Sequence, residues 1–337
     1  MKSFSTILGV VAATALMTTT AFAEGGPLAI WGGGKQGGSV YTDVYVPSII
    51  GALEQQALAG YTWGGVSEGT VANAATVTKN PTNLAVGQYD LLKDLNGKPS
   101  KDGTPYAFTI LAPDIGPECL YLVTAQPGYN TFGDFLGNAF QISVATGSEL
   151  SGSYGTFKKL NELYPDIGQM VVENVGGAPD IIEAVKSGKT THGFFVMRPD
   201  PQSETFKAIN EAKLTIIPVV DFGLQDDYKF LNLKVANGGF LGIGGQAKSV
   251  NTACTSVSLI TGDPTSAAAT SLTPRDLKRL QVTIQRVGSM QATQLRPNIS
   301  SWADMWDNLT VLAQDQAQAA MEASKKALDD ILAAQGK

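Results

Sequence analysis

Apolar runs and amphipathic stretches alternate over the first ninety residues of the chain. Segments 27–31, 61–66 and 84–88 have the short apolar pattern of strands. A glycine-rich turn at 32–39 follows the first of them, and the spacing of apolar residues over 44–58 predicts a helix. A strand followed by a glycine turn and a helix opens an α/β unit, so this part of the chain is predicted to form an α/β lobe.

The same alternation starts again in the middle of the chain. Strand patterns at 140–144, 170–175 and 193–197 are separated by helical patterns at 154–163 and 180–186. Two such series predict two similar lobes with largely parallel sheets. In folds of this kind, ligands bind in a crevice at the carboxyl ends of the strands.

Two further segments predict strands that cross between the lobes. Two prolines and a glycine separate the strand patterns 108–112 and 119–124, which is typical of a domain crossover. The Thr-, Ser- and Val-rich run 251–261 predicts a strand that returns to the first lobe. The expected division is a signal peptide at 1–23, a first α/β lobe made of 24–113 plus 255–337, and a second α/β lobe at 114–254.

The C-terminal region is predicted to be helical. Thr273 and Pro274 start a helix that reaches about Val287, because proline is favoured at the first helical position. An alanine-rich pattern predicts a further helix over 302–334, which can be interrupted near Gln314. We expect this tail to pack on the first lobe.

The N-terminal segment has the pattern of a secretory signal peptide. Lys2 precedes an apolar run at 7–17, and Ala21-Phe22-Ala23 is a small-x-small cleavage site. The run is too short for a permanent membrane span, and no later apolar run is long enough to cross a bilayer. No lipid-accepting cysteine follows the cleavage site. We therefore expect cleavage after Ala23 and a mature protein in the periplasm.

Composition narrows the classes of partner and cofactor. The chain is 43% hydrophobic and 16% charged, as in globular proteins, and its net charge of −6 argues against nucleic-acid binding. A single histidine, His192, and the lack of a Cys/His/Asp cluster predict no metal and no cofactor. Cys119 and Cys254 lie in apolar strand patterns, where an exported protein can hold a disulfide or two core thiols. The sequence leaves both states open.

Two polar turns of the first lobe are candidate ligand contacts. Ser39 and Tyr41 stand between a strand and a helix, where backbone N–H groups and hydroxyls can hold an anion or a carbonyl group. Glu68-Gly69-Thr70 and Asn73 occupy the next strand–helix junction. Each turn has a structural alternative, a tight βα turn in the first case and a helix N-cap in the second.

The turn at 147–154 repeats this pattern in the second lobe and offers Ser151 and Ser153. An exported serine hydrolase is the alternative from a different class, with Ser151 or Ser148 as nucleophile and His192 as base. The turn lacks the G-x-S-x-G spacing of a nucleophile elbow, and a histidine at the start of an apolar strand is typical of a structural residue. We therefore predict that the protein is not an enzyme.

Arg198 directly follows an apolar strand, at the end that faces the crevice of an α/β lobe. Its planar guanidinium can form two parallel hydrogen bonds with a carboxylate, so we predict that it is the counter-ion of the ligand. The alternative is a surface arginine that pairs with Asp200.

These three turns and the end of the strand pattern at 84–88 occur in an order that resembles a known family. The segments Gly38-Ser39-Val40-Tyr41, Glu68-Gly69-Thr70-Val71-Ala72-Asn73, Val86-Gly87-Gln88-Tyr89-Asp90 and Ser151-Gly152-Ser153 are similar to the signature turns of TAXI-type solute receptors. These receptors are the substrate-binding subunits of one class of TRAP transporters. The resemblance covers residues 31–209.

The resemblance implies a type II periplasmic binding-protein fold, with two α/β lobes, two crossover hinge strands and a ligand held between the lobes. It implies a small carboxylate as ligand and the membrane subunits of a transporter as partners, and we expect a monomer. The ligand contacts carried over from the family are Ser39, Tyr41, Thr70, Asn73, Gln88, Ser151 and Ser153. A ligand-sensing partner of a membrane receptor is a further alternative.

Overall fold

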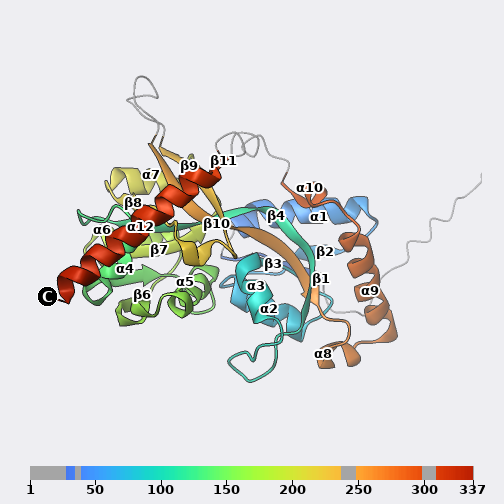
Figure 1. The fold of residues 1–337 in the computed structure, drawn as a ribbon. Helices are drawn as coiled ribbons and strands as arrows, with labels where there is room; N and C mark the ends of the chain where they lie inside the picture. The colour runs from blue at the N-terminus through green and yellow to red at the C-terminus, as the bar shows by residue number, and fades with distance from the viewer. Residues whose placement is uncertain (1–27, 35–38, 237–247, 298–308, 337) are drawn as a thin grey trace, which may run out of the picture.

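Figure 1 shows a computed structural model of the chain, which describes residues 28–34, 39–236, 248–297 and 309–336. The signal peptide predicted at 1–23 lies outside the described residues. Two groups of strands and helices lie side by side, and two long strands, β4 (Phe108–Thr124) and β10 (Lys248–Gly262), run between them.

The first lobe is built on three parallel strands in the order β2-β1-β3. Its elements are β1 (Leu28–Trp31), a π-helix (Tyr41–Tyr45), α1 (Val46–Gln55), β2 (Tyr61–Trp63), α2 (Thr70–Lys79), β3 (Leu84–Gln88), α3 (Tyr89–Leu95), α8 (Ala267–Thr270), α9 (Pro274–Gly288) and α10 (Ala292–Leu295). Successive residues of β3 face opposite sides of the sheet. Val86 therefore packs in the cluster formed by α1 and α9, and Ala85 packs in the cluster formed by α2 and α3.

The second lobe repeats this plan with parallel strands in the order β7-β5-β6. Its elements are α4 (Phe132–Gly137), β5 (Ser143–Thr146), α5 (Gly152–Leu163), β6 (Val171–Asn174), α6 (Ala178–Lys186), β7 (His192–Met197), α7 (Glu204–Glu211), β8 (Thr215–Ile217) and β9 (Lys229–Ala236), with 3-10 turns at Ala139–Gln141, Pro165–Gln169 and Phe222–Leu224. Aromatic side chains of α4 and α5 cover one face, and aliphatic side chains of α6 and α7 together with Phe206 cover the other.

The strands β4 and β10 take part in both lobes. The first part of β4 pairs with β10, and its last part pairs with β7 and β8. Conversely, the last part of β10 pairs with β3, and its first part pairs with β9. The two-lobed α/β fold with two crossover strands is therefore confirmed. The lobe boundaries expected after residues 113 and 254 lie on these strands and stay a prediction.

The expected break in the first crossover strand is wrong, because β4 continues from Phe108 to Thr124. Residues 113–115 bulge out of register opposite Ser258, so the ladder resumes at Gly116 with Val257 as its partner. The hydroxyls of Ser256 and Ser258 both donate hydrogen bonds to the Pro113 carbonyl at 2.9 Å. Proline has no N–H to donate to the ladder, and a residue in a bulge makes no ladder bond, so the strand continues past Pro113.

A disulfide joins Cys119 of β4 to Cys254 of β10, which settles the alternative that the sequence left open. Both cysteines are buried, and their Cα atoms are 3.9 Å apart. Glu118 and Thr255, the adjoining residues, are paired in the ladder between the two strands. The bond therefore lies where both strands pass from one lobe to the other.

The expected packing of the C-terminal tail on the first lobe is also wrong. The short strand β11 (Leu309–Val311) pairs with β9, and α12 (Gln314–Gln335) lies against α4 of the second lobe (Figure 1). The Gln335 side chain donates a hydrogen bond to the Gly137 carbonyl at 2.9 Å. The start of the helix expected at 302 lies outside the described residues. Neither α12 nor any other described helix is both long enough and apolar enough to cross a membrane.

Candidate ligand-binding site between the lobes

The first turns of α2 and α5 face each other across the two lobes. A Cβ atom placed on Gly69, the residue before α2, would lie 3.2 Å from the Gly152 nitrogen and 3.4 Å from the Ser151 Cα atom. The Ala72 N–H donates a hydrogen bond to the Leu150 carbonyl at 3.3 Å, which joins the lobes directly. The structure is therefore in a closed conformation.

This arrangement brings together two positive helix ends. The first N–H groups of a helix have no partner within the helix, and the aligned peptide dipoles add partial positive charge there. In α2 these groups include the N–H of Thr70 and Val71, and in α5 those of Gly152 and Ser153. Two such ends at close range repel each other and attract an anion.

The glycines at this junction allow the close approach. Gly69 has φ +122°, a conformation that L side chains rarely adopt. A Cβ atom on Gly152 would overlap the Gln88 Oε1 atom and lie 3.0 Å from the Thr70 hydroxyl oxygen. A side chain at position 152 would therefore have to displace the Gln88 amide, which is buried and donates a hydrogen bond to the Thr156 hydroxyl.

Three of the residues predicted from sequence meet at this point. The Gln88 N–H donates to the Thr70 hydroxyl at 3.1 Å, and both side chains are buried. The Gln88 side-chain amide donates to the Thr156 hydroxyl of α5 at 3.2 Å. Ser151 stands directly before Gly152 as the N-cap of α5. Thr70, Gln88 and Ser151 thus converge on one gap from two lobes.

Asn73, Ser151 and Ser153 make structural hydrogen bonds. The Asn73 amide donates to the carbonyls of Gly32 and Val86, and so joins the turn after β1 to strand β3. The Ser151 hydroxyl accepts the Tyr154 N–H at 3.1 Å, and the Ser153 hydroxyl accepts the Val196 N–H at 3.0 Å. Ser151 is therefore a helix N-cap, whereas the side-chain N-cap considered for the turn at 68–73 does not form, because Gly69 occupies the N-cap position of α2.

Ser39 lies next to residues 35–38 of its turn, which are outside the described residues. Its N–H donates to the Asp43 carboxylate at 3.0 Å, at an exposed position. The structure describes no contact between Ser39 and the gap at Gly152. Its assignment to the ligand therefore stays a prediction.

Tyr41 reaches from the first-lobe turn to the crossover strand β4. A Cβ atom on Gly33 would lie 3.4 Å from the Tyr41 ring and 3.4 Å from the Gly69 Cα atom, so the ring lies beside the first turn of α2. Its hydroxyl donates a hydrogen bond of 2.5 Å to Glu118. Burial raises the pKa of the Glu118 carboxyl to about 8, and the charge of Asp90 adds to the rise, although the Tyr41 hydrogen bond opposes it.

Arg198 lies in the same interior region and not on the surface. The side chain is 7% exposed and forms an ion pair with Asp200. Burial and the charge of Glu118 raise the pKa of the Tyr45 phenol in the first lobe. Arg198 is near enough to Tyr45 for its positive charge to offset part of this rise. The pairing with Asp200, which was the alternative to a ligand role, is therefore present, but the arginine is buried and not on the surface.

The sequence analysis missed two buried acids between the lobes, Glu118 and Asp90. Asp90 of α3 accepts hydrogen bonds from Thr156 at 3.2 Å and Tyr228 at 2.7 Å, both in the second lobe. Burial raises the pKa of its carboxyl, and the two hydroxyls partly oppose this. The sequence carried one signal for Glu118. It stands between Pro117 and Cys119, at the start of an apolar strand pattern, where an acidic residue is unusual.

The serine–histidine pair of the hydrolase alternative does not form. His192 is the first residue of β7, whereas Ser151 follows the last residue of the parallel strand β5. The two side chains therefore lie at opposite edges of the sheet. The His192 ring packs against Tyr129 and Phe135, and burial lowers its pKa to about 4. Among the described residues, no group of three His, Cys, Asp or Glu side chains is placed to hold a metal ion.

No protein-family model matches the chain. No curated protein sequence matches it either.

Many solved structures are similar to the chain. MatC from Rhodopseudomonas palustris with bound malate is 15% identical with a TM-score of 0.46, over 90% of this chain and 98% of that one. The periplasmic binding protein BugD is 12% identical with a TM-score of 0.45, over 90% and 95%. A TctC solute binding protein from Polaromonas is 14% identical with a TM-score of 0.41, over 90% and 96%. These likenesses are too distant to assign a ligand.

Proposed function

We propose that the protein is a periplasmic receptor that captures a small organic anion, a carboxylate, between its two lobes. The convergence of the α2 and α5 first turns on one gap supports this proposal most strongly. Backbone N–H groups at Thr70 and Gly152 would hold the anion, because two helix ends supply directed donors and partial positive charge. Arg198 would supply the full positive charge.

Binding would act by shifting an equilibrium between open and closed lobes. Without an anion, the two positive helix ends oppose closure, and an anion between them removes that repulsion. The ion pair of Lys101 with Glu149 also joins the lobes, but both side chains are exposed and such a pair contributes little. The ligand would therefore decide how far the protein closes.

The closed form would then deliver its ligand to a membrane transporter of TRAP type, as the resemblance to TAXI-type receptors implies. Eight side chains are proposed around the ligand: Ser39, Tyr41, Thr70, Asn73, Gln88, Ser151, Ser153 and Arg198. Asn73, Ser151 and Ser153 would shape the turns through the hydrogen bonds they make in the closed form, whereas Thr70, Gln88 and Arg198 would contact the ligand directly.

Replacing Gly152 by alanine tests the site. The new methyl group would overlap Gln88 Oε1, so the lobes should stay apart and affinity for the best carboxylate should fall at least about tenfold. Calorimetric titration with a carboxylate library measures the affinity, and small-angle X-ray scattering measures closure. Gly51→Ala is the matched control, because Gly51 is also helical and its added Cβ would touch nothing within 4 Å. Equal affinity and equal compaction in both variants would remove this gap from the binding site.

Arg198→Ala tests the proposed counter-ion. Loss of a charge-assisted contact of about 1.5–3 kcal/mol should weaken binding of the same carboxylate by about ten- to a hundredfold. Asp200→Asn is the comparison, since it removes the competing carboxylate and should keep or increase the affinity. Cooperative unfolding of Arg198→Ala would show that the variant is folded. If this folded variant bound the carboxylate as tightly as wild type, Arg198 would serve only to neutralise the charge of Asp200.

A further inference from the structure

One face of α5 lies against the first lobe beyond the gap at its first turn. The residues of this face recur at the spacing that places them on one side of a helix, and they are Gly152, Gly155, Thr156 and Lys159. A Cβ atom on Gly155 would lie 2.7 Å from Leu91 Cδ1 of α3 and 3.5 Å from Val71 Cγ2 of α2. A side chain here would have to move Leu91, so glycine allows α5 to approach α3 closely.

Lys159 stands at the far end of this face and joins the two lobes. Its ammonium group is 2.7 Å from the Asp94 carboxylate of α3 and 2.9 Å from the Asp227 carboxylate of its own lobe. It also donates a hydrogen bond to the Asp90 carbonyl at 3.4 Å. An ammonium group has three N–H donors, so these acceptors match its capacity, and two of them belong to the first lobe.

The segment that leads into β9 brings further side chains of the second lobe to α3. Asp227 forms an ion pair with Lys93 of α3, and the Tyr228 hydroxyl donates a hydrogen bond to the Asp90 carboxylate at 2.7 Å. Thr156 of α5 donates to the same carboxylate at 3.2 Å. We call this group the α3 clasp, and its members are Asp90, Lys93 and Asp94 of the first lobe with Thr156, Lys159, Asp227 and Tyr228 of the second.

The central ion pair of the clasp is charged and largely removed from solvent. Burial lowers the pKa of the Lys159 ammonium, but the hydrogen bonds with Asp94 and Asp227 outweigh it, so this pKa lies above that of an ordinary lysine. The Lys159 side chain is 9% exposed. Salt screens a partly buried pair much less than an exposed one. The clasp should therefore contribute more to closure than the exposed pair of Lys101 with Glu149.

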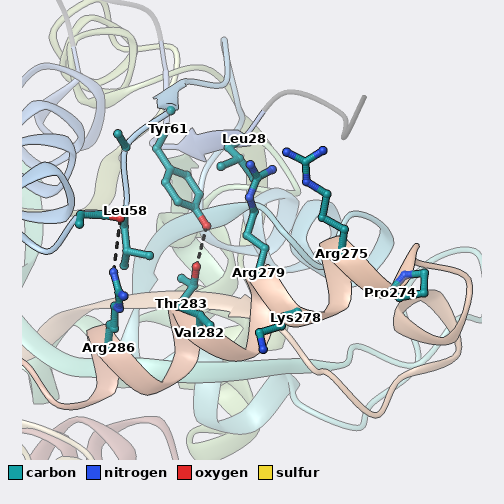
Figure 2. Close-up of a pocket in the computed structure, with 13 residues that line it drawn as sticks. Leu28, Leu58, Tyr61, Pro274, Arg275, Lys278, Arg279, Val282, Thr283 and Arg286 are labelled. Atoms are coloured by element: carbon teal, nitrogen blue, oxygen red, sulfur yellow. Dashed lines mark hydrogen bonds between the residues drawn. The ribbon is translucent and has the colours of Figure 1, made fainter. Parts of the chain in front are cut away.

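The first lobe is held together internally, so opening must act on the clasp. Leu92 of α3 is fully buried in one hydrophobic cluster with side chains of α2. Figure 2 shows the hydrogen bond of 3.2 Å that joins the Tyr61 hydroxyl of β2 to the Thr283 hydroxyl of α9. Arg286 of α9 donates to the Gln56 carbonyl, just after α1, at 2.7 Å. A rotation of this lobe about β4 and β10 would therefore draw α3 away from the second lobe.

We propose that the α3 clasp is a second closing contact, which sets how much of the protein is closed before an anion arrives. This inference rests on the proposed function, in which closure captures a carboxylate. The helix ends at the gap oppose closure without an anion, and the clasp offsets part of that opposition. Apparent affinity scales with the fraction of protein in the binding-competent conformation. Lys159 is thus a positioning residue, which raises affinity without touching the carboxylate.

Two variants remove the contact of Lys159 with the first lobe. Lys159→Met removes the charge and keeps an apolar stem, whereas Asp94→Asn removes one partner and leaves Lys159 paired with Asp227. We expect small-angle X-ray scattering to show that both variants are more open than wild type without a ligand. Calorimetric titration with succinate as the probe should show an affinity at least about fivefold lower. Lys158→Met, at the adjoining exposed position of α5, removes the same charge and should change neither measurement.

Scattering from the ligand-free protein decides the proposal without any ligand. Asp94 is 36% exposed, so Asp94→Asn should fold even if Lys159→Met does not unfold cooperatively. Wild-type compaction of ligand-free Asp94→Asn and of folded Lys159→Met would overturn the proposal. So would weaker succinate binding without any change in ligand-free compaction, because Lys159 would then act within its own lobe. If wild type bound neither succinate nor another carboxylate of the library, the proposed function would fail, while open ligand-free variants would still support the clasp.

Discussion

Replacing Cys119 and Cys254 together by alanine should lower the free energy of unfolding by about 5 kcal/mol. The bond joins residues 135 apart in sequence, and the chain-entropy estimate for a loop of about 100 residues is already about 4.7 kcal/mol. The bond also holds β4 to β10 at the point where both strands leave one lobe for the other. Urea unfolding followed by tryptophan fluorescence measures the change.

Reduced wild type separates the covalent bond from packing. Both sulfur atoms are buried, so the alanine pair also removes apolar contacts that reduction leaves in place. We expect wild type in dithiothreitol to lose most of the same stability and the alanine pair to be insensitive to the reductant. A loss below about 1 kcal/mol in both would mean that the ladder between β4 and β10 alone fixes this junction.

The sequence predicted those parts of the fold that depend on local pattern. The strand expected at 84–88 has the same bounds in the structure, where all five residues are buried, as is typical of a short apolar run in a parallel sheet covered on both faces. The return strand expected at 251–261 was also correct in position, and the observed β10 extends beyond it at both ends, from Lys248 to Gly262. The repeat of two strand–helix series was enough to predict two lobes.

Features that depend on contacts between distant segments were not predictable in this way. The position of α12 is decided by Gly133 and Gly137 of α4, where an added Cβ would overlap the Ser324 carbonyl or crowd Ile331. Nothing in the alanine-rich pattern of α12 indicates that partner. Likewise, a proline in an isolated sequence predicts a strand end, and only the pairing with β10 shows that Pro113 stands in a bulge.

The candidate site was predicted by position better than by side-chain role. Turns at the carboxyl ends of β1, β2 and β5 were expected to converge. Thr70 after β2 and Ser151 after β5 do so, together with Gln88 at the end of β3, whereas no such contact is described for Ser39 after β1. Sequence could not separate a ligand contact from a cap, because a serine at a helix start can serve as either. The acids Glu118 and Asp90 were missed because their partners, Tyr41 and Tyr228, come from distant segments.

Glu118 is expected to make the protein less stable as the pH rises from about 4.5 to about 8. Its pKa is about 8 in the folded protein, against 4.5 for an ordinary glutamate, so between these values the folded state binds more protons than the unfolded state. The free energy of unfolding must then fall with rising pH, and the fall ends above the folded pKa. At 1.36 kcal/mol per pKa unit, the total contribution approaches about 5 kcal/mol.

Glu118→Gln should therefore stabilise the protein above pH 8 and flatten its stability profile between pH 4.5 and 8. Glutamine keeps an acceptor for the Tyr41 hydroxyl but carries no charge, so the desolvation cost of the carboxylate disappears. Urea unfolding at half-unit pH steps measures how the free energy of unfolding changes with pH in wild type and in Glu118→Gln. Part of the wild-type slope should remain in the variant, because burial also raises the pKa of Asp90. Glu149→Gln, at an exposed position, should leave the slope almost unchanged. If the Glu118→Gln and wild-type profiles ran parallel, the Glu118 carboxyl would have to be ionised at neutral pH, with a positive charge of the protein or its ligand beside it.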